Sequence, residues 1–193
     1  MKSHSTLEMA LLGLVAQKPQ SGYDLRKTFA TTAMRHYSDS PGSIYPALRR
    51  IESRGWIETT EAKADQGDPR RKQNYRLTDA GKKVLLAWLE LPVSAEDVRE
   101  QKAELMLRFA FMDGNVPRST TIRFLDEFAP ELAAYAAESR TKWEQMRDQI
   151  AKAMPGRAPF HTGLLAFESG IEGMEAQVKW ARRVRSQLME DSR

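Results

Sequence analysis

Residues 42–57 combine side chains that can contact DNA with the spacing of a short helix. Ser43, Tyr45, Arg49 and Arg50 fall on or near one face of this helix, and the residues between them are mostly apolar. Polar and cationic side chains on such a face can bind phosphate oxygens and the edges of bases in a groove. We therefore predict that these four side chains contact DNA, and that duplex DNA is a partner of the chain.

A second basic cluster, Arg70, Arg71 and Lys72, follows in a loop between two strand-like segments. These segments, at about 56–62 and 74–77, are rich in aromatic, threonine and β-branched residues, which predicts a β-hairpin. Basic residues at the tip of a hairpin can reach the phosphates beside a helix that lies in a groove. The three residues are therefore also predicted DNA contacts, and the order helix then basic hairpin is the outline of a winged helix-turn-helix.

Pro46 determines where the DNA-facing helix begins. Proline disrupts a helix interior, but the first turn tolerates it because the N–H groups there have no helical acceptor. With Ser43 as the N-cap, Pro46 becomes the third helical residue. Helices are also predicted at 5–17, after Ser21 as an N-cap, and from Thr78 to just before residue 92.

The predicted fold class is mainly α with a small β-hairpin wing, divided at Pro92. Residues 1–92 form a winged helix-turn-helix DNA-binding domain, and residues 93–193 form an all-helical domain for dimerisation and, as a candidate second role, effector binding. The second half begins with one helix from Ser94 to about residue 112. A long helix follows at about 117–154, with a kink or a short break expected at Pro130.

The last predicted helix, at about 162–189, carries a heptad-like apolar seam. The long helices could close on one another as a small bundle, or they could present their seams to a second copy. We favour a homodimer, because one winged helix covers little DNA and a two-fold pair reads both halves of a palindrome. The predicted dimer contacts are Phe167, Ile171, Met174, Val178, Ala181 and Leu188.

Charge and composition agree with this prediction and argue against other classes. Residues 1–91 hold 15 Lys and Arg against 10 Asp and Glu, whereas residues 92–193 hold 15 against 16. The excess positive charge thus lies in the half with the predicted DNA-binding helix. No apolar run has the length of a signal peptide or a membrane span, so we expect a soluble cytoplasmic protein without a membrane partner.

Catalysis and metal binding are not expected. The chain has no cysteine, and its histidines, His4, His36 and His161, lack the spacing of a metal site. It contains no glycine-rich nucleotide loop and no nucleophile motif. We predict no catalytic residue, no metal and no cofactor, and therefore no enzyme. A ligand pocket lined by aromatic residues remains an alternative to a core or dimer interface for Trp88, Phe109, Phe111, Trp143 and Trp180.

The motif around the DNA-facing helix resembles the PadR family of bacterial transcriptional regulators. The resemblance rests on the block at 40–52, on Gly22-Tyr23 before it and on residues 75–81 after it. Several rigid positions, among them Gly42, Pro46 and Gly81, fall at the family's spacing. The second half is similar, in its helix pattern and in the entry to its last helix, to the larger subgroup with a long helical C-terminal domain.

The resemblance implies a dimeric repressor that binds an inverted repeat and is released by a small molecule or by a change of dimer shape. It implies that Ser43, Tyr45, Arg49 and the basic residues of the wing face DNA. Gln73 and Asn74 depart from the family, which often has a basic residue and an apolar one at these two positions. We therefore expect the wing to depend more on its tip.

Two other functions remain open from the sequence. A winged helix can lose DNA binding and serve as a protein-interaction module, although the basic residues at 49, 50 and 70–72 argue against this. The chain could also bind any duplex without sequence preference, which would give a steep salt dependence and equal affinity for all sequences.

Overall fold

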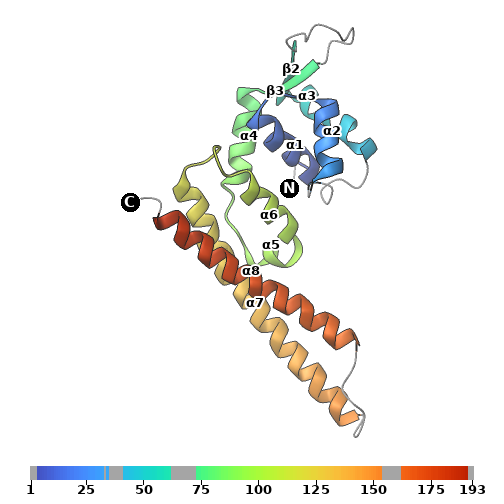
Figure 1. Ribbon diagram of the computed structural model, residues 1–193, viewed down its shortest axis with the longest axis vertical. Coiled ribbons are helices and arrows are strands. Elements are labelled where there is room, and N and C mark those ends of the chain that lie inside the picture. Colours follow the sequence, from blue (N-terminus) through green and yellow to red (C-terminus); the bar gives the residue numbers. More distant parts are fainter. Residues whose placement is uncertain (1–3, 33, 35–40, 62–72, 154–161, 191–193) are drawn as a thin grey trace. The chain divides into compact units, whose positions relative to one another are not determined.

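The structure of the chain is a computed structural model that describes residues 4–32, 34, 41–61, 73–153 and 162–190. These residues form helices and one small antiparallel sheet, which confirms the predicted fold class (Figure 1). In chain order the elements are α1 (Thr6–Gln17), β1 (Gln20–Ser21), α2 (Gly22–Thr31), η2 (Pro41–Ser43), α3 (Ile44–Ser53), β2 (Ile57–Glu61), β3 (Gln73–Leu77), α4 (Asp79–Leu89), α5 (Ala95–Glu100), α6 (Lys102–Ala110), α7 (Arg118–Ala153) and α8 (Thr162–Glu190).

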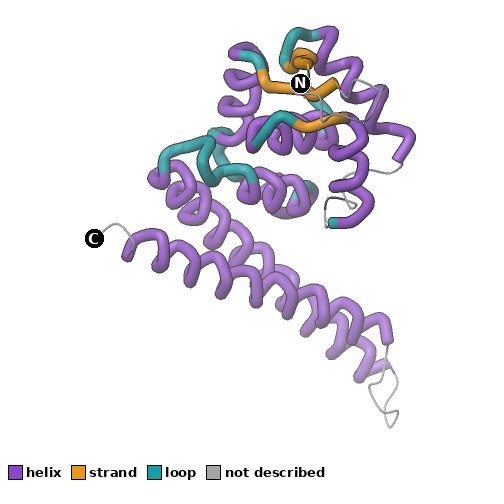
Figure 2. Tube along the Cα trace, turned by 45° about the horizontal axis from the view of Figure 1, so that its top comes forward, coloured by secondary structure: helices purple, strands orange, loops and turns teal. Residues whose placement is uncertain are grey.

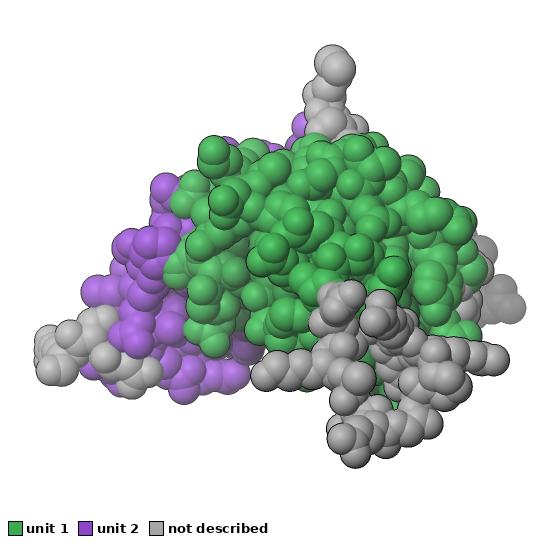
Figure 3. All heavy atoms as spheres, turned by 90° about the horizontal axis from the view of Figure 1, so that it is seen from above, with its two compact units in different colours: residues 1–91, 106–116 green, residues 92–105, 117–193 purple. Residues whose placement is uncertain are grey.

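The chain divides into two compact units (Figure 3). The first comprises residues 1–91 together with 106–116, and the second comprises residues 92–105 together with 117–193. The chain therefore leaves the first unit at residue 92, returns at 106 and leaves again at 117. The functional division into a DNA-binding domain at 1–92 and a dimerisation domain at 93–193 stays a prediction.

The first unit is built around α1, which packs against α3, α4 and β3. Most of α1 is apolar, and its residues from Met9 to Val15 are buried. Ser5 begins the helix with a capping box, in which its hydroxyl accepts the Glu8 N–H and the Glu8 carboxylate accepts the Ser5 N–H. The core of the unit thus forms around a helix whose start is set by local hydrogen bonds.

Residues 106–116 complete this core, a feature that the sequence did not reveal. The buried ring of Phe111 lies so close to α1 that a Cβ added to Gly13 would stand 2.5 Å from it. Arg108 is also buried, and its guanidinium donates to the carbonyl of Leu91 just beyond α4. The prediction of one helix from Ser94 to about residue 112 is wrong, because Gln101 has non-helical backbone angles (φ −130°, ψ 25°) and ends α5.

The sheet has the strand order β1-β3-β2, and both neighbouring pairs are antiparallel. Figure 2 draws the strands in orange. The predicted hairpin strands are confirmed as β2 and β3, which pair Thr59 with Tyr75. β1 was not predicted, because two residues are too few to show an alternating pattern. It adds a third strand by pairing Gln20 with Tyr75, and the Gln20 amide donates to the buried Leu14 carbonyl at 2.7 Å.

The junction between α3, β2 and α4 is the tightest point of the first unit. Gly55 follows α3 with a φ of +71°, a left-handed conformation that favours glycine. Thr78, the N-cap of α4, donates from its N–H to the Trp56 carbonyl at 3.1 Å and from its hydroxyl to the Gly55 carbonyl at 2.6 Å. Gly81 packs directly on the same Trp56 carbonyl, where any Cβ would overlap it. The chain between α3 and β2 is thereby tied to the start of α4.

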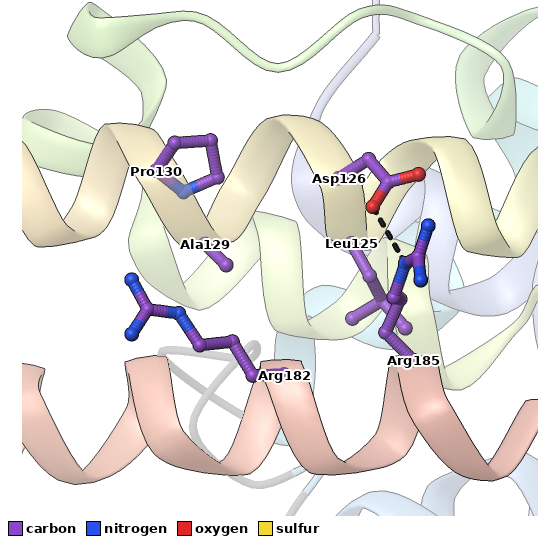
Figure 4. A pocket seen from close by; sticks show the side chains of 6 residues that line it. All are labelled: Leu125, Asp126, Ala129, Pro130, Arg182 and Arg185. Carbon is purple, nitrogen blue, oxygen red and sulfur yellow. Dashed lines mark hydrogen bonds and ion pairs between the residues drawn. The ribbon is translucent and has the colours of Figure 1, made fainter.

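The second unit is dominated by the packing of α7 against α8, with α5 against α7. α7 continues through Pro130 without interruption, so of the two expectations for this proline a short break is wrong, and a kink stays a prediction. Ion pairs link the helices, among them Arg140 with Glu175 at 3.0 Å and Arg185 with Asp126 at 2.8 Å (Figure 4). A hollow of about 320 Å³ lies beside the second pair, and none of the aromatic residues considered for a pocket lines it.

We predict that Gly81→Ala destabilises the first unit, because its methyl group would collide with the Trp56 carbonyl. Overpacking of this kind typically costs about 1–3 kcal/mol. Gly170→Ala in α8 is a matched control, since nothing lies within 4 Å of a Cβ there and alanine is favoured over glycine in a helix by about 0.5–1 kcal/mol. Urea unfolding followed by circular dichroism should show opposite signs for the two variants. A Gly81→Ala chain as stable as the wild type would contradict the close packing.

Candidate nucleic-acid interface

The orientation of α3 is set by its apolar side, which packs against α1 and α2. Four side chains of this helix have no solvent exposure: Ile44, Ala47, Leu48 and Ile51. Their spacing places them on one stripe, so the rest of the helix must face outward. Tyr45 is 42% exposed, and Arg49 and Arg50 are also exposed. The structure therefore brings three of the predicted DNA contacts to an accessible surface.

The start of α3 agrees with the prediction in position but not in detail. Ser43 is the N-cap and Pro46 is the third helical residue, where a missing N–H costs nothing. The Ser43 side chain makes no capping hydrogen bond, because the turn Pro41–Ser43 leads into the helix with helical backbone angles at Ser43 (φ −79°, ψ −21°). The half-exposed Ser43 hydroxyl is thus not needed as a cap, and its contact with DNA stays a prediction.

Exposed aromatic rings occur on both α3 and α2. The Tyr45 ring lies over Gly22, where an added Cβ would stand 2.9 Å from the ring. The next residue, Tyr23, is 53% exposed, and the Arg26 guanidinium lies 5.5 Å from the centre of its ring. Tyr23 and Arg26 were not predicted as site residues. In the sequence they form a tyrosine and an arginine three residues apart on one helix face. Many surface helices share this pattern, so it does not single out a binding site.

Tyr75 joins the surface from β3. Burial raises the pKa of its phenol above the ordinary value, Glu52 and Tyr45 add to the rise, and the positive charge of Arg49 opposes it. The charges of Glu52 and Arg49 on α3 thus act on the phenol of Tyr75. With a raised pKa, Tyr75 stays a neutral phenol that can donate a hydrogen bond at physiological pH.

Arg50 has a partner within the protein. Its Nε donates to Oε1 of Glu8 at 2.8 Å, and Arg54 donates to Oε2 of the same carboxylate at 2.9 Å. The Arg54 guanidinium also lies 4.9 Å from the centre of the Trp56 ring. Glu8 is buried on α1, so this cluster joins α1, the end of α3 and the start of the wing. Contact of Arg50 with DNA stays a prediction, and the ion pair adds a role in holding α3.

The Glu8 carboxylate is charged despite its burial. Burial acts to raise its pKa, but hydrogen bonds from Arg50, from the Ser5 N–H and from Arg54 together lower the pKa below the ordinary value of a glutamate. A buried charge of this kind is tolerated only when it is paired and hydrogen-bonded. This pair could not be predicted from the sequence, because its members are 42 residues apart.

The tip of the wing lies outside the described residues, so the contacts predicted for Arg70, Arg71 and Lys72 stay predictions. The described residues of β2 and β3 include one cation, and it lies toward the base of the hairpin. Arg76 on β3 pairs across the hairpin with Glu58 on β2, with 2.6 Å between Nη2 and Oε1. Its charge is thus partly compensated within the hairpin.

The predicted dimer contacts divide into two groups. Ile171, Met174, Val178 and Ala181 are buried within a single copy, in a helix that packs on α7. Phe167 and Leu188 are partly exposed. The assignment of all six to a dimer interface stays a prediction, but the heptad-like seam is already covered by α7. A second copy would have to contact the outer faces of α7 and α8.

The described residues contain neither a membrane-spanning helix nor a cluster suited to a metal ion. No described helix has the length and apolarity needed to cross a membrane. Within the same residues, no three histidine, aspartate or glutamate side chains gather in a way that could hold a metal ion.

Residues 11–87, which run from within α1 to within α4 and include α3, match the model of the transcriptional regulator PadR-like family. Over these residues the chain is similar to a family of transcriptional regulators. The match covers much of the first unit and none of the residues after 87.

Full-length similarity extends the match to known regulators. The chain is 26% identical to the negative transcriptional regulator PadR of Bacillus subtilis over 186 residues, which cover 96% of this chain and 98% of the relative. It is similar to the crystal structures of that protein with operator DNA (24% identity, TM-score 0.41, 94% and 98% of the two chains) and with p-coumaric acid (24% identity, TM-score 0.39, 95% of each chain).

We predict that the stability of the chain depends on the charge of Glu8. Because the folded-state pKa of Glu8 is lowered, its contribution is complete above the ordinary glutamate pKa and is lost as the pH falls through the folded-state value. Glu8→Gln should therefore lower the free energy of unfolding at pH 7 by roughly 1–3 kcal/mol. Urea unfolding at pH 7, 5, 4 and 3 should show the two proteins converging as the pH falls. A constant difference at all four pH values would contradict the ionised state.

Proposed function

We propose that the chain is a homodimeric repressor that binds an operator with inverted repeats. The single observation that supports this most strongly is the outward face of α3, with Tyr45 and Arg49 exposed opposite a fully buried apolar side. The relative from Bacillus subtilis is named a negative transcriptional regulator, which supports repression. An operator partner also implies a cytoplasmic location.

Within this proposal α3 lies in the major groove, where Arg49 contacts a base edge and Tyr45 and Ser43 contact the edge of the groove. The wing grips the adjacent backbone through Arg70, Arg71 and Lys72. The helices of the second unit hold two copies so that their α3 helices are about one helical turn of DNA, roughly 34 Å, apart. A small-molecule effector that changes this spacing would release the operator.

Exposed apolar side chains on the helix pair support a second copy as its partner. Met146, Leu165 and Met189 on α7 and α8 are each 46% exposed. Large apolar side chains on a surface gain free energy when a partner covers them. These three side chains are not part of the buried stripe of α8. Their exposure agrees with a dimer in which the outer faces of α7 and α8 contact the second copy.

Two alternatives predict different behaviour. A protein-interaction module would bind neither its own upstream DNA nor an unrelated duplex. A nonspecific binder would bind both equally, with an affinity that falls steeply with salt.

We predict that Arg49→Ala weakens binding to the DNA upstream of the gene and relaxes the preference for one base pair in each half-site. The loss of one base contact should cost about 1–3 kcal/mol. Fluorescence anisotropy with operator variants, each changed at one position, measures the preference. Arg71→Ala is the comparison variant, and it should weaken binding to all duplexes alike. The slope of the logarithm of the affinity against the logarithm of the salt concentration should become shallower by about 0.9 for each lost phosphate contact. Identical behaviour of the two variants would contradict this division between helix and wing.

We predict that the chain is a dimer at micromolar concentration. Gel filtration with light scattering should give twice the chain mass of 22.0 kDa. A mass of one chain at this concentration would contradict the proposed pairing of two α3 helices.

A further inference from the structure

The ion pair between Glu8 and Arg50 uses only one edge of the guanidinium. The contact joins Nε of Arg50 to Oε1 of Glu8 at 2.8 Å, and within the described residues no hydrogen bond joins a terminal nitrogen of Arg50 to another residue. The Glu8 side chain is 3% exposed, whereas the Arg50 side chain is 49% exposed. The guanidinium is therefore held by Glu8 along one edge, and about half of the Arg50 side chain is accessible to an acceptor from outside.

The place of Arg50 on α3 favours a phosphate as that acceptor. Successive helical residues are about 100° apart, so Arg50 lies on the flank of the helix next to the face that carries Arg49. When a helix lies in the major groove, its central face meets base edges and its flanks meet the backbones that border the groove. Arg50 is thus placed for the backbone rather than for a base.

Glu8 has two effects on such a contact. It holds the Arg50 side chain in one orientation before DNA arrives, which reduces the ordering that binding would otherwise require. Its negative charge also lowers the positive charge of this flank, which weakens attraction to phosphates at any other position. The first effect favours the correct register, and the second disfavours every other register.

We propose that Glu8 is a specificity-determining residue that acts through Arg50. It positions one phosphate contact for the operator and suppresses binding of the same arginine to unrelated DNA. Arg54 shares the carboxylate but also stacks on Trp56 at 4.9 Å, so a second contact holds it when Glu8 is removed. The inference rests on the proposed function in one respect, the approach of α3 to DNA.

The test compares wild type and Glu8→Gln on the upstream DNA and on an unrelated duplex of equal length, over a series of salt concentrations. For the variant we expect weaker binding to the upstream DNA, tighter binding to the unrelated duplex, and a ratio of the two affinities at least tenfold lower. The salt slope on the unrelated duplex should steepen by about 0.9, one additional phosphate contact. Circular dichroism at the assay temperature establishes that the variant is folded.

A double-mutant cycle separates this role from a merely structural one. In an Arg50→Ala background, Glu8→Gln should change the affinity ratio by less than twofold, because the residue through which Glu8 acts is gone. An unchanged ratio in the single variant, or an equal loss of affinity for both duplexes, would overturn the inference. If the inference about Glu8 fails in this way while the wild type still prefers its upstream DNA, the proposed function stands. A wild type without preference would overturn both.

Discussion

The complete burial of one side of α3 is the constraint on which the rest of the first unit depends. Ile44, Leu48 and Ile51 have no solvent exposure, and burial of each such side chain contributes about 1.5–3 kcal/mol. Only one rotation of α3 about its own axis buries all of these side chains. Its polar side is therefore presented at a defined angle, which is what a helix that reads a groove requires.

The contacts at the end of α3 add to this constraint. Glu8 binds the helix from α1, and the Thr78 and Gly81 junction binds the chain immediately after it to α4. Through Trp56 the same junction begins the wing. The recognition helix and the hairpin are thus held by one set of short contacts, which keeps two DNA-contacting elements in register without a large core.

The parts of the fold that could be predicted from the sequence depend on local rules. Pro46 could only lie in a first turn, Ser21 and Thr78 form caps, and the two hairpin strands have a clear composition. The exposed positions of Tyr45 and Arg49 follow from the same helical spacing. These features need no knowledge of distant residues, because each is determined within a few residues of chain.

The features that could not be predicted involve residues far apart in the chain. Glu8 meets Arg50 across 42 residues, and Phe111 fills the space over Gly13 from a segment assigned by its pattern to the second half. The seam of α8 illustrates a different limit. An apolar stripe has the same spacing whether a helix of the same chain or of a second copy covers it, and here α7 buries Ile171 and Ala181.

Recognition of a specific DNA sequence by the exposed side of α3 can be tested by an anisotropy titration. The wild-type chain is titrated against the DNA upstream of its gene and against an unrelated duplex, at several salt concentrations. We expect binding to the upstream DNA to be tighter by at least about 10³-fold at physiological salt. Equal affinity for the two duplexes, or binding to neither, would contradict it.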